Sequence, residues 1–185
     1  LLGTVSGLGQ LIAAPVIGRL SDRYGRRPLL IVAVAGTVLG FLLLGFAKSL
    51  WMIFLSRAVD GLLGGNTALA RAYITDITEP QDRAKRLGLI GAAFGLGFII
   101  GPVMGGFLST AGLNVPALVA AGLAIFNLIA IIVWLPESLA PEERKQRRTN
   151  PHTAFNLSNL LDEFRRPCVG PLLTISLFYA FAFTL

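Results

Sequence analysis

Charge is scarce in this 185-residue chain, because Asp, Glu, Lys and Arg make up only 14% of it, against about 25% in an average soluble domain. Cysteine and histidine occur once each, as Cys168 and His152, and this excludes a disulfide framework and a thiolate metal site. The sequence also lacks a glycine-rich Walker loop for nucleotide phosphates, and no nucleophile–base set is visible. We therefore predict no enzymatic activity, no bound metal and no cofactor.

Apolar residues dominate instead, at 54% of the chain, and they gather in six long runs. These runs are residues 1–17, 29–47, 50–74, 87–110, 116–135 and 168–185. A helix needs about 20 apolar residues to cross the hydrocarbon core of a bilayer. Buried helices of a large soluble protein usually keep a polar stripe, whereas five of these six runs contain no charged residue and no histidine. The pattern predicts an all-α, polytopic membrane helix bundle with the lipid bilayer as its partner.

The cations, which give the chain a net charge of +6, occupy every second link between the apolar runs. The links at 18–28, 75–86 and 136–167 hold 13 of the 16 Lys and Arg residues, and the opposite links hold only Lys48. Short basic clusters beside apolar runs suit anionic lipid headgroups better than nucleic acid, so no nucleic-acid partner is predicted. By the positive-inside rule, the basic links are expected in the cytoplasm.

The link at 18–28 (GRLSDRYGRRP) has a spacing that charge alone does not explain. Gly18 is expected to end the first span, Asp22 to accept hydrogen bonds from backbone amides at a helix start, and Gly25 to allow a tight reversal. An ordinary basic turn is the alternative. It would explain the arginines and the proline of this link, but not the position of Asp22 between the two glycines.

Seven residues of this link resemble the cytoplasmic signature between the second and third helices of the major facilitator superfamily: Gly18, Leu20, Asp22, Arg23, Gly25, Arg26 and Arg27. Further stretches resemble motifs of the same family in the same order. They are 57–61 (RAVDG) in the fourth helix, 97–106 (GFIIGPVMGG) in the fifth helix of drug/proton antiporters, and 135–138 (LPES) at the exit from the sixth helix. Residues 72–78 (AYITDIT) and 82–84 (DRA) are most similar to tetracycline-efflux proteins.

The resemblance implies a fold of twelve helices in two halves of six, of which this chain would hold a part. Residues 1–138 would form the N-terminal transmembrane bundle with helices two to six, 139–167 the central cytoplasmic loop, and 168–185 the start of the seventh helix. The chain is thus expected to be a fragment, with the missing C-terminal half as its partner. Within the loop, apolar residues at i, i+3, i+4 and i+7 from Leu157 predict a short amphipathic helix, and a flexible linker is the alternative.

The resemblance also implies roles for the basic link after the first span. In the family, the carboxylate that corresponds to Asp22 contacts the C-terminal half and helps to hold the outward-facing state. The loop arginines, here Arg23 and Arg26, pair with acids at the cytoplasmic end of the fourth helix. This chain has Asp76 and Glu79 there. The predicted conformational switch consists of Gly18, Asp22, Arg23, Gly25, Arg26, Arg27, Asp76 and Glu79.

Two charges of opposite sign lie close together inside the third apolar run. Arg57 and Asp60 are three residues apart and share one helical face, so they should face each other, a neighbouring helix or a watery cavity. The functional interpretation is an element that couples protons or substrate to transport, and the alternative is a structural ion pair near the extracellular headgroups. Tetracycline exporters carry an acid in the third helix where this chain has Gly40, and usually a neutral residue where it has Asp60. This departure disfavours tetracycline itself and suggests that the coupling acid has moved.

Polar residues that interrupt the spans are candidates for a substrate cavity, because such side chains usually face the bundle interior or a water-filled space. In the family, the second, fourth and fifth helices border the cavity. This favours Gln10 and Asn66, and Arg71 follows Asn66 on the same span.

The run at 87–110 is crowded with glycine, and small residues at i, i+4 spacing let membrane helices pack closely. Pro102 removes the backbone hydrogen bond to the carbonyl of Phe98 and should bend the helix. Generic tight packing is one interpretation. The resemblance implies a sharper one, in which a kinked helix seals against the first span and prevents leak. The predicted sealing motif consists of Gly97, Gly101, Pro102, Gly105 and Gly106.

These observations predict a secondary active transporter, and the fifth-helix motif favours proton-coupled efflux of drug-like or amphipathic small molecules. The proton gradient would supply the energy, since the sequence has no ATP-binding loop. A nutrient or metabolite symporter, or a uniporter, is the alternative on the same fold, and a non-transporting membrane receptor or scaffold is the alternative class. We expect the protein in the bacterial plasma membrane, with several passes and with its basic loops in the cytoplasm.

Overall fold

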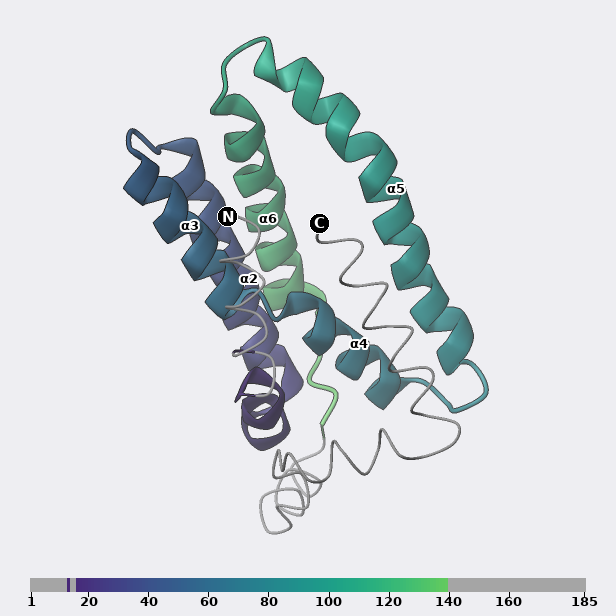
Figure 1. The fold of residues 1–185 in the computed structure, drawn as a ribbon. Coiled ribbons are helices and arrows are strands. Elements are labelled where there is room, and N and C mark those ends of the chain that lie inside the picture. The colour runs from purple at the N-terminus through teal and green to yellow at the C-terminus, as the bar shows by residue number, and fades with distance from the viewer. Residues whose placement is uncertain (1–12, 14–15, 140–185) are drawn as a thin grey trace, which may run out of the picture. The chain divides into compact units, whose positions relative to one another are not determined.

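The structure, a computed structural model, describes residue 13 and residues 16–139, and in these ranges it contains helices and connecting turns but no strand (Figure 1). A helical stretch at 16–24 comes first. It is followed by α2 (Arg26–Gly45), α3 (Leu50–Leu63), α4 (Asn66–Ile77), α5 (Arg83–Ser109) and α6 (Val115–Trp134). The all-α prediction is therefore confirmed. The predictions for Gln10, for the amphipathic helix after Leu157 and for 168–185 fall outside the described residues.

Three of the described helices are long and apolar enough to cross a bilayer, namely α2, α5 and α6, with 20, 27 and 20 residues. They coincide with the predicted spans 29–47, 87–110 and 116–135 within a few residues at each end. The ends follow local chemistry. Ser49 accepts a hydrogen bond from the Met52 amide before α3, and Pro116 lies in the first turn of α6, where a missing N–H is harmless.

The third predicted span, 50–74, is not one continuous helix. α3 ends at Leu63 and α4 begins at Asn66, with Gly64 and Gly65 between them. The Gly65 amide bonds to the Leu63 carbonyl at 2.9 Å, so the regular pattern of the helix is interrupted there. Glycine is a poor helix former because its unfolded backbone has the most freedom to lose. Two adjacent glycines in an apolar run therefore give two shorter helices in series.

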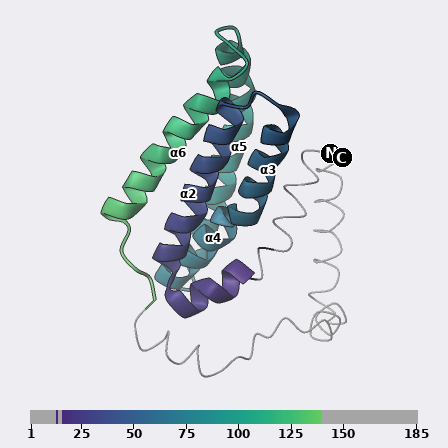
Figure 2. The same cartoon turned by 90° about the vertical axis from the view of Figure 1, so that its left-hand side faces the viewer.

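α2 lies between α6 and α3 (Figure 2), and the packing around it is close because α2 carries small residues. A Cβ at Gly36 would clash with the Leu63 side chain, and a Cβ at Gly45 would lie 2.6 Å from the Leu118 Cδ2 atom. A buried apolar cluster joins Leu30 and Ala33 of α2 to Leu69 and Tyr73 of α4, and it is flanked by Ile17, Leu29, Ile131 and Leu135. α2 is thus the element on which the neighbouring helices pack.

The first turn of α3 and the end of α6 lie at opposite ends of the bundle (Figure 1), and each carries a tryptophan. Trp51 in α3 is 83% exposed and Trp134 in α6 is 77% exposed. Tryptophan is enriched at both membrane–water interfaces, where its ring sits at headgroup depth. Their positions fit a bundle that spans the bilayer, with the Trp134 end on the side of the basic links.

Candidate functional site

The basic end of the bundle, where the links at 18–28 and 78–82 lie, is organised around one buried arginine. The Arg26 guanidinium contacts Asp22 at 2.7 Å and Asp76 at 2.9 Å, and it also donates a hydrogen bond to the Ser21 hydroxyl. The Arg26 side chain is only 9% exposed. These four residues, the Arg26 cluster, come from the 16–24 helix, α2 and α4. An arginine held between two acids can exchange one partner for another without being left unpaired.

The local backbone differs in part from the predicted loop. The helix continues past Gly18 as far as Tyr24, and the reversal occurs at Gly25, whose φ of 109° is accessible mainly to glycine. Gly25 was therefore predicted correctly, but Gly18 does not end the helix. Asp22 lies within the 16–24 helix, not at a helix start as predicted, and it pairs with Arg26 four residues later.

Three hydrogen bonds at this end were not anticipated from the sequence. Glu137 Oε1 accepts a hydrogen bond from the Arg26 amide at 2.8 Å, and the Arg27 side chain donates to the Ile132 carbonyl at 2.6 Å. The Tyr73 hydroxyl donates to the Pro136 carbonyl at 2.9 Å. The sequence signals for this group were the stretch 135–138 (LPES), which resembles the family's exit from the sixth helix, and the acid that it places shortly after the apolar run of α6.

The other residues of the predicted switch lie elsewhere at this end. The Arg23 guanidinium stacks over the Tyr24 ring, with 5.6 Å to the ring centroid. Glu79 is exposed and accepts a hydrogen bond from the Gln81 side chain at 2.9 Å. Of the two acids considered for the loop arginines, the structure therefore brings Asp76 to Arg26.

Arg57 and Asp60 face each other inside α3. Their charged groups are 3.8 Å apart, and both side chains are about three-quarters buried, with 23% and 24% exposed. Asp60 also faces α2, because a Cβ at Gly40 would lie 3.2 Å from the Asp60 Cβ. The Asp60 carboxylate and the Arg57 guanidinium thus pair on α3, and Asp60 lies on the side of α3 that packs against α2.

The remaining cavity candidates have different surroundings. Asn66, at the start of α4, donates its side-chain amide to the Thr37 hydroxyl at 2.9 Å, and Thr37 in turn bonds to the Ala33 carbonyl at 3.4 Å. The Asn66 Oδ1 atom is buried and has no hydrogen-bond partner within the part of the chain that the structure describes. Arg71 is exposed.

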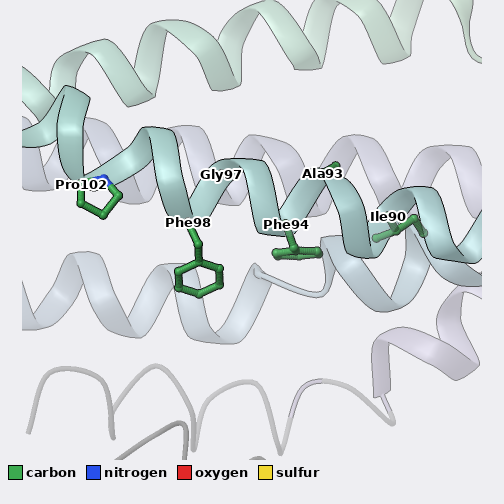
Figure 3. Close-up of a pocket in the computed structure, with 6 residues that line it drawn as sticks. All are labelled: Ile90, Ala93, Phe94, Gly97, Phe98 and Pro102. Atoms are coloured by element: carbon green, nitrogen blue, oxygen red, sulfur yellow. The ribbon is translucent and has the colours of Figure 1, made fainter.

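The glycine face of α5 is open towards the other described helices. A Cβ at Gly97, Gly101, Gly105 or Gly106 would meet nothing within 4 Å, and α5 has no buried residue. Beside Gly97 and Pro102 lies an open apolar hollow of about 590 Å³, with Ile90, Ala93, Phe94 and Phe98 along the same helix (Figure 3). The predicted sealing partner, residues 1–17, lies almost wholly outside the described residues.

The sequence model of the family described as Major Facilitator Superfamily matches residues 1–185. The chain belongs to the major facilitator superfamily. It is an integral, multi-pass membrane protein with part of the helical bundle of that family, as the match to the whole chain and the three long apolar helices together show.

The relatives within this family include resistance proteins and an animal transporter. The chain is 41% identical to the tetracycline resistance protein, class C, of Escherichia coli over 149 residues, which are 80% of this chain and 37% of the relative. It is 39% identical to the major facilitator superfamily domain-containing protein 10 of Bos taurus, over 78% of this chain and 31% of the relative. The chain thus spans about a third of the length of these relatives.

A solved major facilitator structure has the same arrangement of helices. The crystal structure of the human organic anion transporter MFSD10 (TETRAN) matches with a TM-score of 0.72 and 31% identity, over 77% of this chain and 33% of that one. The partial major facilitator fold expected from the sequence is therefore confirmed.

Proposed function

We propose that this chain is the N-terminal part of a proton-coupled exporter of drug-like, amphipathic small molecules. The observation that carries the proposal is the Arg57–Asp60 pair, about three-quarters buried between apolar helices. Ionisable groups at such positions are costly, roughly 2.5–3.5 kcal/mol each on insertion scales, and in transporters they mark ion and substrate pathways. The tetracycline resistance relatives support efflux as the direction of transport.

Asp60 is the residue that would carry the proton. In its charged form it pairs with Arg57 across 3.8 Å. Protonation removes the negative charge of Asp60, so the ion pair with Arg57 is lost and the balance of charge at this place in α3 changes. A proton can drive transport only through such a difference between two states. The Asp60 site lies between α2 and α3, so the change would act on the packing of these two helices.

The Arg26 cluster would act as the conformational latch at the opposite end of α2. Asp22 is one-third exposed, whereas Asp76 is 16% exposed, so Asp22 is the acid within reach of a further partner. In the proposal, that partner is the C-terminal half of the same transporter, and the basic links face the cytoplasm of a bacterial cell. An exposed ion pair contributes only about 0–1 kcal/mol to stability. Such a latch therefore acts by forming in one conformation of the transporter and not in the other.

Dye efflux from everted membrane vesicles that contain the full-length transporter tests the proposal. Efflux that collapses on addition of a protonophore, and that Asp60→Asn abolishes, is the expected result. Asp82→Asn is the control, because Asp82 is an exposed acid that lies outside the membrane span and outside the predicted switch. Protonophore-insensitive transport would indicate a uniporter, and inward accumulation a symporter.

A further inference from the structure

Two helix ends meet at the basic end of the bundle, where residues 135–139, the exit segment, leave α6 and pass the beginning of α2. We infer that Glu137 is a positioning residue for the Arg26 cluster, and that Glu137 and Arg27 together tie the end of α6 to the start of α2. The inference rests on the proposed function, because it gives the latch of that transporter its support. It extends the proposal to residues that act on Arg26 through the backbone.

The start of α2 lacks a cap of its own. Gly25, which precedes the helix, has no side chain, and the first turn contains no acid. Glu137 supplies both missing elements from 111 positions further along the chain, since its Oε1 atom lies 2.8 Å from the Arg26 amide and 3.5 Å from the Arg27 amide. A carboxylate at this place satisfies free N–H groups and also complements the positive end of the helix dipole.

The end of α6 has the complementary deficiency. Its last turn contains no basic residue, although the carbonyl groups there carry the negative end of the dipole. Arg27, from the first turn of α2, donates to the Ile132 carbonyl at 2.6 Å. The exit segment after α6 thus supplies an acid to the start of α2, and α2 supplies a base to the end of α6. Both contacts lie at the same α2–α6 junction.

α4 holds the exit segment from a third side. The Tyr73 hydroxyl donates to the Pro136 carbonyl at 2.9 Å, and Leu139 is only 2% exposed. Tyr73 precedes Asp76 by three residues, so one face of α4 anchors the exit segment and also supplies an acid to Arg26. The exit segment and the Arg26 cluster are thus two parts of one junction.

The consequence is that the Arg26 side chain cannot be placed independently of Glu137. The Arg26 amide is fixed by Glu137, while its guanidinium reaches Asp22 and Asp76. A shift of the first turn of α2 would withdraw the guanidinium from one acid or both. Through Glu137, a conformational change near the exit segment would move the first turn of α2 and so alter the contacts of Arg26 with Asp22 and Asp76.

A labelling experiment on the full-length transporter tests this inference. In a background in which Cys168 and any cysteine elsewhere in the full-length transporter are replaced by Ser, Ser21→Cys places a thiol at a site that is 0% exposed and beside Arg26, and the rate of maleimide labelling reports the opening of the cluster. Glu137→Ala is expected to raise that rate about tenfold, because a hydrogen bond to a charged acceptor is lost. Glu137→Gln keeps an acceptor oxygen and should recover most of the protection. Asp82→Ala, at an exposed acid with no side-chain cap contact, is the matched control.

Transport is measured on the same variants without the added thiol. We expect Glu137→Ala to lower turnover about tenfold with an unchanged KM, and Glu137→Gln to restore it in part. Unchanged labelling in Glu137→Ala overturns the inference, and so does faster labelling with normal turnover, which would leave Glu137 a structural cap only.

If Glu137→Ala does not accumulate in the membrane, Tyr73→Phe decides, and the same labelling rate as in the parent overturns the inference. A parent protein that does not transport contradicts the proposed function, whereas the labelling result still decides the role of Glu137.

Discussion

Gly40 of α2 faces Asp60 of α3 so closely that a Cβ at position 40 would lie 3.2 Å from the Cβ of Asp60 and 3.4 Å from the Ser56 carbonyl oxygen. Most Cβ contacts in proteins are wider than this. The missing side chain on α2 is therefore what makes room for the acid on α3. Positions 40 and 60 are two sides of one contact, and a carboxylate at either could reach the same small region between the helices.

A carboxylate exchange between these positions follows from that geometry. Asp60→Gly should abolish proton-driven efflux, and the double variant Gly40→Asp with Asp60→Gly should restore part of it, because the acid returns to the interface from the other helix. Efflux driven by an imposed pH gradient in vesicles is the measurement.

The single variant Gly40→Asp is the control for the exchange. It overpacks the contact and brings two carboxylates together, so a loss of stability of about 1–3 kcal/mol is expected. A double variant that is folded and inserted but as inactive as Asp60→Gly would show that the position of the acid at α3, and its pairing with Arg57, is required.

The two acids around Arg26 should respond differently to removal of their charge. Asp76→Asn leaves a buried guanidinium with one fewer charged partner, at a side chain that is 16% exposed, and we expect a loss of about 1–3 kcal/mol in the free energy of unfolding. Asp22→Asn affects a side chain that is 33% exposed, so its cost should be below about 1 kcal/mol. Thermal unfolding of the purified transporter measures both.

Transport should be sensitive to Asp22→Asn even though that change costs little stability. Asp22→Asn, although nearly neutral for stability, should slow efflux and change cross-linking between the two halves, because the proposal gives Asp22 a second partner. Equal transport and equal cross-linking in Asp22→Asn and the parent would refute the latch.

Close packing of α2 against α3 gives a prediction about stability alone. Gly36→Ala should lower the free energy of unfolding by about 1–3 kcal/mol, because the new Cβ would clash with the Leu63 side chain, including its Cβ atom. Gly88→Ala on α5 is the matched change, since nothing lies within 4 Å of a Cβ there. It should be neutral or stabilising by about 0.5–1 kcal/mol through helix propensity. Similar unfolding curves for both variants would show that α2 and α3 can move apart without cost.

The features that the sequence predicted correctly are local. The spans of α2, α5 and α6 follow from uninterrupted apolar runs, and the Arg57–Asp60 contact follows from a spacing of three residues on one helix. The turn at Gly25 follows from the one residue that adopts its φ readily.

The features that the sequence did not predict depend on distance along the chain or on competition between weak preferences. Glu137 and the Arg26 amide are 111 positions apart, so no local pattern connects them. The interruption at Gly64 and Gly65 lies within an apolar run, and the hydropathy of the side chains carries no information on where the helical backbone breaks. The helix at 16–24 continues through Gly18 because one glycine costs a helix only about 1 kcal/mol, and the Ser21 hydroxyl bonds back to the Gly18 carbonyl at 2.7 Å within the same helix.

The open glycine face of α5 leads to the last prediction. A Cβ at position 101 would meet no atom within 4 Å among the described residues, so the bundle of α2, α3, α4 and α6 should tolerate Gly101→Leu. Closely spaced small residues in membrane helices usually serve a partner helix, and the resemblance to antiporters implies a seal at this motif. We therefore expect Gly101→Leu to uncouple the transporter, with a faster proton leak across vesicles and loss of efflux. Gly88→Leu is the control, because it adds the same side chain to the same helix outside the motif. Equal leak rates in the two variants, with efflux retained, would mean that lipid rather than a sealing helix covers Gly101.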